Sequence, residues 1–208
     1  SRGERTIYRH CDVVDLERVL KETQGKHRRT LVISDGVFSM DGDLAPLPDL
    51  VRLAERHDAV LMVDDAHGTG VLGEKGRGTV EHFGLDGRVP IQMGTLGKAL
   101  GSFGAYIAGD RNLVRNLQNT SRSYIFSTSL PPAVCAASLA ALDVLDQEPW
   151  RREQLGENRK RFADGLSALR INIGSSQTPI IPVFVGDADQ CLAAYRRLFE
   201  HGIFAPAI

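Results

Sequence analysis

The sequence predicts an α/β fold with a mainly parallel sheet, because short apolar runs alternate with amphipathic helical segments along most of the chain. The apolar runs are rich in Val, Ile, Leu and Met, which is typical of strands buried in a parallel sheet. Composition agrees, since 208 residues that are 42% hydrophobic and 25% charged can bury a sizeable core.

The expected elements follow one another in a regular order. The helical spacing of Leu50, Leu53 and their neighbours predicts a helix over residues 48–57. Glycines are too frequent between residues 68 and 78 for a regular element. Asp110 is expected to cap a helix that ends near residue 118, and prolines at 131 and 132 to open a longer one. The apolar runs predict strands at residues 30–34, 59–63, 89–93 and 104–108.

A break in the pattern at residues 147–150 predicts a domain boundary. Residues 1–146 then form part of a large domain, and residues 147–208 the start of a smaller α+β domain. The smaller part is expected to hold a charged helix at 151–169, an edge strand at 178–185 that contains two prolines, and a helix at 187–201. Because the chain stops in the apolar run IFAPAI, we expect a fragment of a longer product.

Charge and cysteine usage exclude several classes of protein. A formal net charge of −1 gives no electrostatic case for nucleic acid or an anionic membrane surface, and no apolar run is long enough to cross a bilayer. Cys11, Cys135 and Cys191 lie far apart with no CxxC pair. This argues against a disulfide framework or a zinc site and fits a cytoplasmic protein. His10 beside Cys11 is interpreted as a surface loop, because adjacent residues rarely form a Cys–His pair.

Polar side chains gather where the predicted strands end. Ligands of α/β sheets bind just beyond the carboxyl ends of the strands, so these side chains are candidates for one site. The clusters are Asp35 with Ser39, the run Asp64-Asp65-Ala66-His67, Thr95 with Lys98, and Ser127 with Thr128.

Lys98 lies in the stretch GTLGKALG, where glycines at 94, 97 and 101 let backbone and ligand approach closely. The stretch is not a phosphate-binding P-loop, because Gln92 stands where that motif needs glycine and Ala99 follows the lysine. A lysine desolvated in such a pocket has a lowered pKa and can attack a carbonyl to form a Schiff base.

Asp64 ends an apolar strand, so its carboxylate is expected to be partly desolvated and to need a cationic partner. A protonated pyridine nitrogen would serve, and His67 could reach the same ligand. Metal binding is the alternative. We predict no metal here, because Asp64 and Asp65 point to opposite sides of an extended chain and no third ligand is evident.

Three motifs in order, SDGVFSMDGD, VDDAHGTGVLGEKGRG and GTLGKALGSFGAY, resemble those of the α-oxoamine synthases. These are pyridoxal 5'-phosphate (PLP) enzymes of the aspartate-aminotransferase fold type, and the resemblance runs from about Ile7 to Ile208. It implies a PLP-dependent transferase of fold type I, with residues 1–146 as part of the large PLP-binding domain and residues 147–208 as a partial C-terminal domain.

The resemblance also implies roles for individual residues. Lys98 would bind PLP covalently and act as the general base. Asp64 would pair with the pyridine nitrogen, His67 and Ser39 would hydrogen-bond the phenolic oxygen, and Thr95 would hold the phosphate. His67 would also polarise the carbonyl of the acyl substrate.

A homodimer with shared active sites is a further implication of the resemblance. Ser127 or Thr128 would reach the phosphate of the cofactor bound in the other subunit. Other cofactor and substrate contacts of the family, a ring-stacking histidine and a carboxylate-binding arginine, have no counterpart in these 208 residues. We therefore expect the chain alone to be weakly active or inactive.

The implied reaction is the decarboxylative condensation of an amino acid with an acyl thioester. Within the family, the motifs are most similar to the member that joins alanine to pimeloyl-CoA or a pimeloyl-carrier protein in biotin biosynthesis. The member that uses glycine and acetyl-CoA is the alternative, and a non-catalytic fragment is the alternative from another class.

Overall fold

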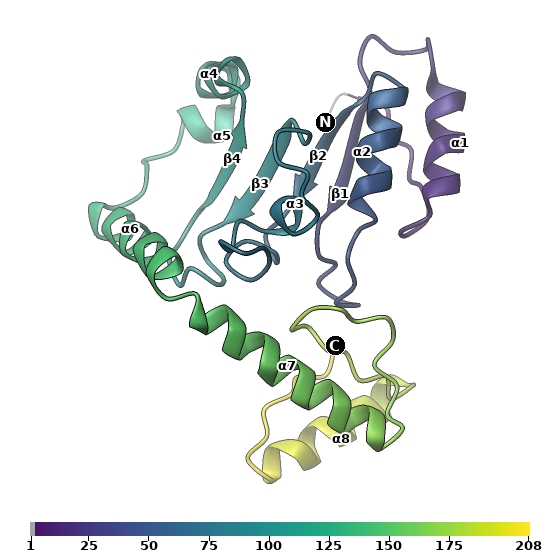
Figure 1. Ribbon diagram of the computed structural model, residues 1–208, viewed down its shortest axis with the longest axis vertical. Coiled ribbons are helices and arrows are strands. Elements are labelled where there is room, and N and C mark those ends of the chain that lie inside the picture. The colour runs from purple at the N-terminus through teal and green to yellow at the C-terminus, as the bar shows by residue number, and fades with distance from the viewer. Residues whose placement is uncertain (1–2) are drawn as a thin grey trace.

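The computed structural model describes residues 3–208, which form a four-stranded sheet and eight helices (Figure 1). The strands are β1 (Leu31–Asp35), β2 (Val60–Asp64), β3 (Ile91–Thr95) and β4 (Ala105–Gly109), in that spatial order. β1, β2 and β3 run parallel, whereas β4 runs antiparallel to β3. All four lie within two residues of the predicted positions, and the mainly parallel α/β fold is confirmed.

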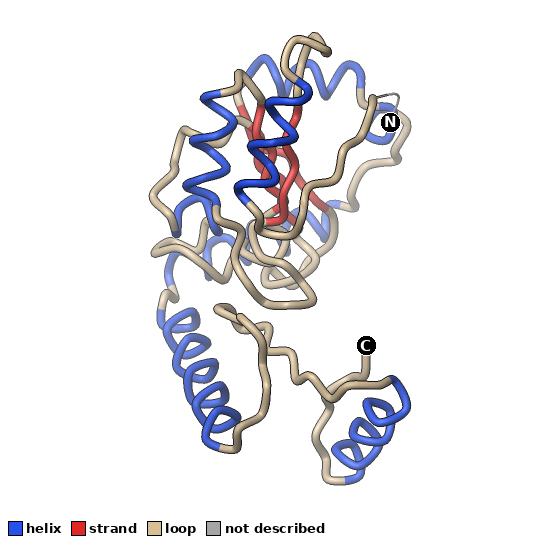
Figure 2. The backbone as a smooth tube through the Cα atoms, turned by 90° about the vertical axis from the view of Figure 1, so that its right-hand side faces the viewer, coloured by secondary structure: helices blue, strands red, loops and turns tan. Residues whose placement is uncertain are grey.

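The core lies between the sheet and two helices, α1 (Val13–Thr23) and α2 (Leu47–Arg56). Helix α2 contacts β2 and α1 contacts α2, so the two helices cover one flank of the sheet in Figures 1 and 2. Helix α2 is amphipathic, and its apolar face is buried as its spacing predicts. The buried core cluster includes Leu47, Leu50, Val51 and Leu53 of α2, Val32 of β1, and Leu61 and Val63 of β2.

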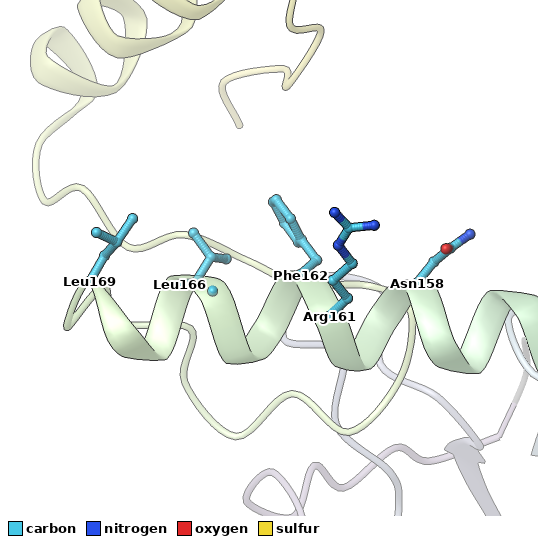
Figure 3. A pocket seen from close by; sticks show the side chains of 6 residues that line it. Asn158, Arg161, Phe162, Leu166 and Leu169 are labelled. Atoms are coloured by element: carbon cyan, nitrogen blue, oxygen red, sulfur yellow. The ribbon is translucent and has the colours of Figure 1, made fainter.

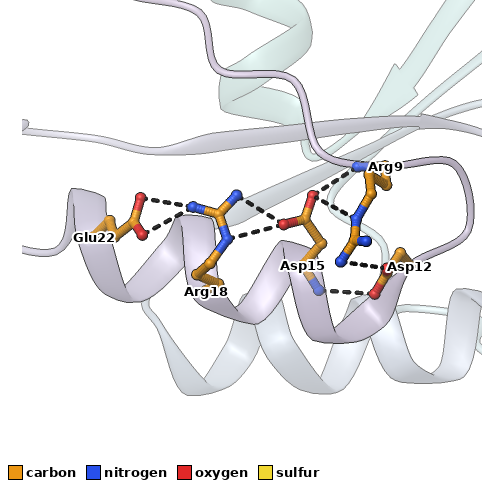
Figure 4. A network of polar contacts seen from close by, with 5 residues as sticks. All are labelled: Arg9, Asp12, Asp15, Arg18 and Glu22. Atoms are coloured by element: carbon orange, nitrogen blue, oxygen red, sulfur yellow. Dashed lines mark hydrogen bonds and ion pairs between the residues drawn. The ribbon is translucent and has the colours of Figure 1, made fainter.

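Helix α1 is not among the elements predicted from the sequence. Asp12 is its N-cap and accepts a hydrogen bond from the Asp15 backbone N–H at 2.9 Å. The buried Asp15 carboxylate accepts hydrogen bonds from the Arg9 backbone and the Arg18 guanidinium, which also pairs with Glu22 (Figure 4). This network fixes the segment that precedes α1 against the helix.

The second face of the sheet is open in the single chain. Alternate residues of β1 are buried against α2, whereas Leu31 and Ile33 point the other way and are 49% and 55% exposed. All residues of β4 are exposed. A parallel sheet normally has both faces covered, so this face is an unpartnered apolar surface.

Beyond β4 the chain is helical. Helices α4 (Arg111–Thr120) and α8 (Ala188–Glu200) are capped by Asp110 and Asp187, at the positions predicted. The other helices are α3 (Thr79–His82), α5 (Arg122–Ile125), α6 (Pro132–Gln147) and α7 (Trp150–Ala168). The break between α6 and α7 falls at the predicted boundary, and the division into domains 1–146 and 147–208 stays a prediction. Within residues 3–208, no helix has the length and apolarity that crossing a bilayer needs.

The strand predicted at residues 178–185 is wrong: this segment is a loop that joins no sheet. Pro179 and Pro182 lack N–H groups, and the described residues offer no neighbouring strand to pair with. Its start is fixed instead to the loop after β1, because the Gly42 carbonyl accepts the backbone N–H and the hydroxyl of Thr178, at 3.2 and 2.9 Å. Thr178 is 2% exposed, so this contact anchors the C-terminal part of the chain beneath the sheet.

Replacing Leu53 by Ala should lower the free energy of unfolding by about 2–5 kcal/mol, because a fully buried leucine leaves a cavity. Leu31→Ala is the matched control, and it should change that free energy by no more than about 0.5 kcal/mol because its side chain is half exposed. Urea unfolding of both variants provides the measurement. A large loss in Leu31→Ala would mean that the open face of the sheet is covered in solution.

Candidate active site

The candidate site lies at the edge of the sheet where β1, β2 and β3 end. Asp35 and Asp64 are paired in register as the last residues of β1 and β2, and Thr95 is the last residue of β3. The parallel arrangement therefore brings three of the predicted polar clusters to one edge.

Asp65 fixes the turn that follows β2. Its backbone N–H donates to the Met93 carbonyl of β3 at 2.7 Å, and its own carbonyl accepts the Gly68 and Thr69 N–H groups. Its carboxylate is 3% exposed and accepts the Thr79 backbone N–H at 2.6 Å, and burial raises its pKa above the usual range. Gly78, at a φ of 101°, is required there, because a Cβ atom would lie 2.0 Å from the Asp65 carboxylate.

Asp64 and Asp65 have different surroundings, as their alternation along an extended chain predicts. Asp64 is half-buried, and its Oδ1 accepts the Ala66 backbone N–H at 3.0 Å. Asp65 is committed to the turn and to Thr79. Asp64 is thus the carboxylate left at the carboxyl edge of the sheet.

Four ionisable side chains share one electrostatic environment at this edge. Burial, and then the charge of Asp64, raise the pKa of the Asp35 carboxyl, while His67 and Lys98 act in the opposite direction. Burial, and then the charge of Lys98, lower the pKa of His67, while Asp35 and Asp64 oppose that shift. From the sequence, Asp35 is a candidate without an assigned role. The structure places it in the same cluster.

Lys98 lies in the loop that joins β3 to β4. The Thr95 hydroxyl donates to the Gly104 carbonyl at 3.0 Å and accepts the Gly97 N–H at 3.2 Å. Lys98 is exposed, so the expectation of a desolvated amine is wrong for the single chain. The physical reason is the loop itself, in which Gly97 and Gly101 supply no side chains to shield the amine.

A cavity of about 300 Å³ lies beside His67 and Lys98. Its size is at the lower end of the range that small-molecule sites occupy, about 300–1,000 Å³. On one side Thr69 is held by a hydrogen bond to the Tyr106 hydroxyl at 3.0 Å. The lining residues are Ala66, His67, Thr69, Val71, Lys98, Ala99, Leu155, Thr178, Pro179 and Ile180.

Sequence reasoning missed the contribution of residues 178–180 to this cavity. They come from a distant part of the chain and reach the site through the contact between Thr178 and Gly42. The one available signal was the proline pair of the TPIIP stretch, which is unusual inside a strand.

Ser39, Ser127 and Thr128 lie outside the residues that line this cavity within the described chain. Ser39 is exposed in the turn after β1. Ser127 and Thr128 are exposed after α5, and the Ser127 hydroxyl donates to the Tyr124 carbonyl at 2.9 Å. Their predicted roles at the cofactor stay predictions.

A larger hollow, of about 560 Å³, runs along one side of α7 (Figure 3). Its lining is mainly apolar, with one charged side chain, and the labelled side chains project from a single helix in Figure 3. It therefore lacks the converging polar groups of a catalytic site. The residues are Asn158, Arg161, Phe162, Gly165, Leu166 and Leu169.

The fold is that of PLP-dependent transferases of fold type I. The chain belongs to the aminotransferase class I and II family, whose model matches residues 1–208. It is 54% identical to an 8-amino-7-oxononanoate synthase of Symbiobacterium thermophilum and 49% identical to 8-amino-7-oxononanoate synthase 1 of Bacillus subtilis. Both matches cover 100% of this chain and 53% of the relative, so the chain spans about half the length of these curated relatives.

Solved structures agree with this family. A serine palmitoyltransferase of S. paucimobilis with a bound PLP–myriocin aldimine superposes with a TM-score of 0.90 at 31% identity, over 96% of this chain and 52% of that one. The 8-amino-7-oxononanoate synthase of Francisella tularensis gives a TM-score of 0.75 at 28% identity, over 90% of this chain and 56% of that one.

The pKa of His67 should lie below its ordinary value of 6.5, because burial and the neighbouring Lys98 disfavour the charged imidazole. The folded state should then lose stability as the pH falls from about 6.5 through the lowered pKa, since the unfolded state binds the proton more readily. Histidine NMR titration gives the pKa. Urea unfolding of wild type and His67→Gln between about pH 7 and 5 gives the part of the free energy of unfolding that is lost through His67. A pKa at or above the ordinary value would contradict this electrostatic picture.

Proposed function

We propose that this chain carries the lysine-bearing half of the active site of a PLP-dependent acyltransferase. The observation that supports it is geometric: Asp35 and Asp64 end neighbouring strands, and His67 and Lys98 line the cavity beside them. The family match and the names of the relatives agree with the proposal.

The donor set at this edge fits pyridoxal phosphate. The carboxylates of Asp35 and Asp64 end neighbouring strands, and their mutual repulsion helps raise the pKa of Asp35. A cationic ring nitrogen beside Asp64 would relieve that repulsion. The exposed amine of Lys98 supplies a nucleophile for an aldehyde, and the adjoining cavity offers space.

When bound, the cofactor supplies an electron sink that stabilises negative charge on the α-carbon of an amino acid. Asp64 would keep the ring nitrogen protonated, which that chemistry requires. Lys98 would hold the cofactor and would remove the α-proton of the amino acid as general base. His67, whose lowered pKa keeps it neutral near pH 7, donates a hydrogen bond to the phenolic oxygen or to the carbonyl of the acyl group.

Thr95 has a more restricted role than the resemblance implies. A hydroxyl has one proton to donate, and that proton is used on the Gly104 carbonyl. Binding a phosphate oxygen would require the hydroxyl to release Gly104. We therefore assign Thr95 first to holding the loop that presents Lys98. It would bind the phosphate only after its hydroxyl has rotated away from the Gly104 carbonyl.

The substrates we propose are L-alanine and a pimeloyl thioester, either pimeloyl-CoA or a pimeloyl-carrier protein. Their decarboxylative condensation gives 8-amino-7-oxononanoate, an intermediate of biotin synthesis. The support is the name shared by the curated relatives at about 50% identity. Glycine C-acetyltransferase, which joins glycine to acetyl-CoA, is the alternative that a substrate comparison resolves.

A homodimer follows from the same proposal. Ser127 and Thr128 are exposed and lie apart from the cavity of their own chain, which suits contact with the cofactor of a second subunit. The open face of the sheet and the exposed strand β4 offer surface for such an assembly. We also propose a cytoplasmic location, because free cysteines and biotin synthesis fit a reducing compartment.

Borohydride treatment of the chain with PLP should leave a phosphopyridoxyl group on Lys98, found by peptide mass spectrometry. Lys98→Ala should lose this label, and Lys75→Ala, which removes an exposed lysine of the neighbouring glycine-rich stretch, should keep it. Labelling spread evenly over surface lysines would contradict the assignment of Lys98. If PLP also left the unfolding midpoint unchanged, a non-catalytic fragment would be the better description.

Single-turnover release of carbon dioxide by the full-length protein should separate the two substrate pairs. Alanine with a pimeloyl thioester should react at least about tenfold faster than glycine with acetyl-CoA, because the acyl pocket must discriminate in the transition state. Lys98→Ala should abolish the reaction with either pair. Faster reaction of glycine with acetyl-CoA would replace the proposed substrates and leave the role of Lys98 intact.

A further inference from the structure

His10, Cys11 and Asp43 form a compact cluster outside the candidate active site. The His10 Nε2 lies 2.8 Å from the Asp43 Oδ2, and the Cys11 Sγ lies 3.5 Å from that nitrogen and 3.7 Å from that oxygen. All three potential ligand atoms lie within 4.8 Å of one another. His10 and Cys11 lie in a surface loop, as the sequence predicts, and their side chains also contact Asp43.

Two distant segments build the cluster. His10 and Cys11 precede α1, where Cys11 adopts a positive φ of 52°, and the His10 ring packs edge-on against Phe38 at 4.3 Å. Asp43 lies in the loop after β1, and its carbonyl accepts the Phe38 N–H at 3.0 Å. Both segments are thus held in place by contacts other than the cluster itself.

One oxygen of the Asp43 carboxylate has no hydrogen-bond partner among the described residues. Asp43 is 9% exposed, and this oxygen, Oδ1, is buried. A buried carboxylate oxygen without a partner is costly, and native structures usually provide a donor or an ion. His10 and Cys11 satisfy only the other oxygen.

Two of the three distances between the ligand atoms match tetrahedral zinc. Zn–S bonds of about 2.3 Å and Zn–N bonds of about 2.0–2.1 Å place S and N about 3.5–3.6 Å apart. The observed 3.5 Å between Cys11 and His10 and 3.7 Å between Cys11 and Asp43 fit this geometry. The 2.8 Å contact between His10 and Asp43 is a hydrogen bond that would open by about 0.5 Å around an ion.

We propose that His10 Nε2, Cys11 Sγ and the Asp43 carboxylate bind a zinc ion, with water as the fourth ligand. The thiolate and imidazole favour zinc over magnesium or calcium, which prefer oxygen ligands. The His10 side chain is 48% exposed, which leaves a path for the ion and room for the water.

Zinc binding at this cluster must release the thiol proton to solvent. The thiolate is the form of cysteine that ligates a metal, so the ion takes the place of the thiol proton on Cys11.

The proposal departs from the sequence-based expectation that no zinc site is present. That expectation rested on CxxC spacing, whereas this cluster combines adjacent residues with Asp43 from another loop. It is independent of the proposed function, because its ligands take no part in the PLP site. A bound ion would tie the segment before α1 to the loop that carries Ser39 and Gly42.

Cobalt titration of the PLP-free chain, stripped of metal by chelator, tests the proposal. Co²⁺ should produce the thiolate-to-cobalt charge-transfer band with one equivalent bound, and Zn²⁺ should displace it. Cys11→Ser and Asp43→Asn should weaken Co²⁺ binding at least about 100-fold, because each removes one of three protein ligands. Circular dichroism would verify that both variants fold.

The Cys135→Ala/Cys191→Ala double variant is the matched control, since it keeps Cys11 and removes the other free thiols. It should retain the band and the rise in melting temperature that Zn²⁺ gives to wild type. A band that persists in Cys11→Ser, or a wild-type chain without any thiolate band, would overturn the proposal. Neither readout involves PLP, so its failure would leave the proposed function untouched.

Discussion

The buried carboxylate of Asp65 is the contact on which the arrangement of the site depends. It accepts the Thr79 N–H at 2.6 Å, while its backbone joins β3 and closes the turn to Thr69. Because this carboxylate is committed inward, the neighbouring Asp64 and the following His67 are directed to the edge where ligands of parallel sheets bind. Of these two adjacent aspartates, Asp65 therefore stabilises the fold, and Asp64 is the one for which we propose a role at the cofactor.

The site is assembled from segments that are far apart in the chain, and each is held by its own anchor. β1 and β2 supply the two carboxylates through strand register, and the β3–β4 loop supplies Lys98. The segment that begins at Thr178 closes the cavity because Gly42 holds it against the loop after β1. Disturbing this anchor would therefore alter the cavity wall without touching a charged group.

Local signals predicted the strands, the capped helices and the cluster of Asp64, His67 and Lys98, since periodicity and capping are written in neighbouring residues. Helix α1 carries the same local signals, an Asp12 N-cap and an apolar face, and was nevertheless not predicted. The other features that were missed depend on long-range contacts. A strand at 178–185 was predicted from β-prone residues, but a strand exists only where another pairs with it. The contact of Cys11 with Asp43 joins residues 32 positions apart, which no spacing rule detects.

The antiparallel direction of β4 restricts the loop that carries Lys98. Because β4 runs antiparallel to β3, the segment between Thr95 and Ala105 is a short hairpin whose two ends are paired with each other. Internal hydrogen bonds, among them Ser102 N–H to the Leu96 carbonyl at 2.8 Å, tie it further. In the proposed function, the Lys98 amine would therefore move by rotation about its own side-chain bonds, because the loop that carries it is tied at both ends.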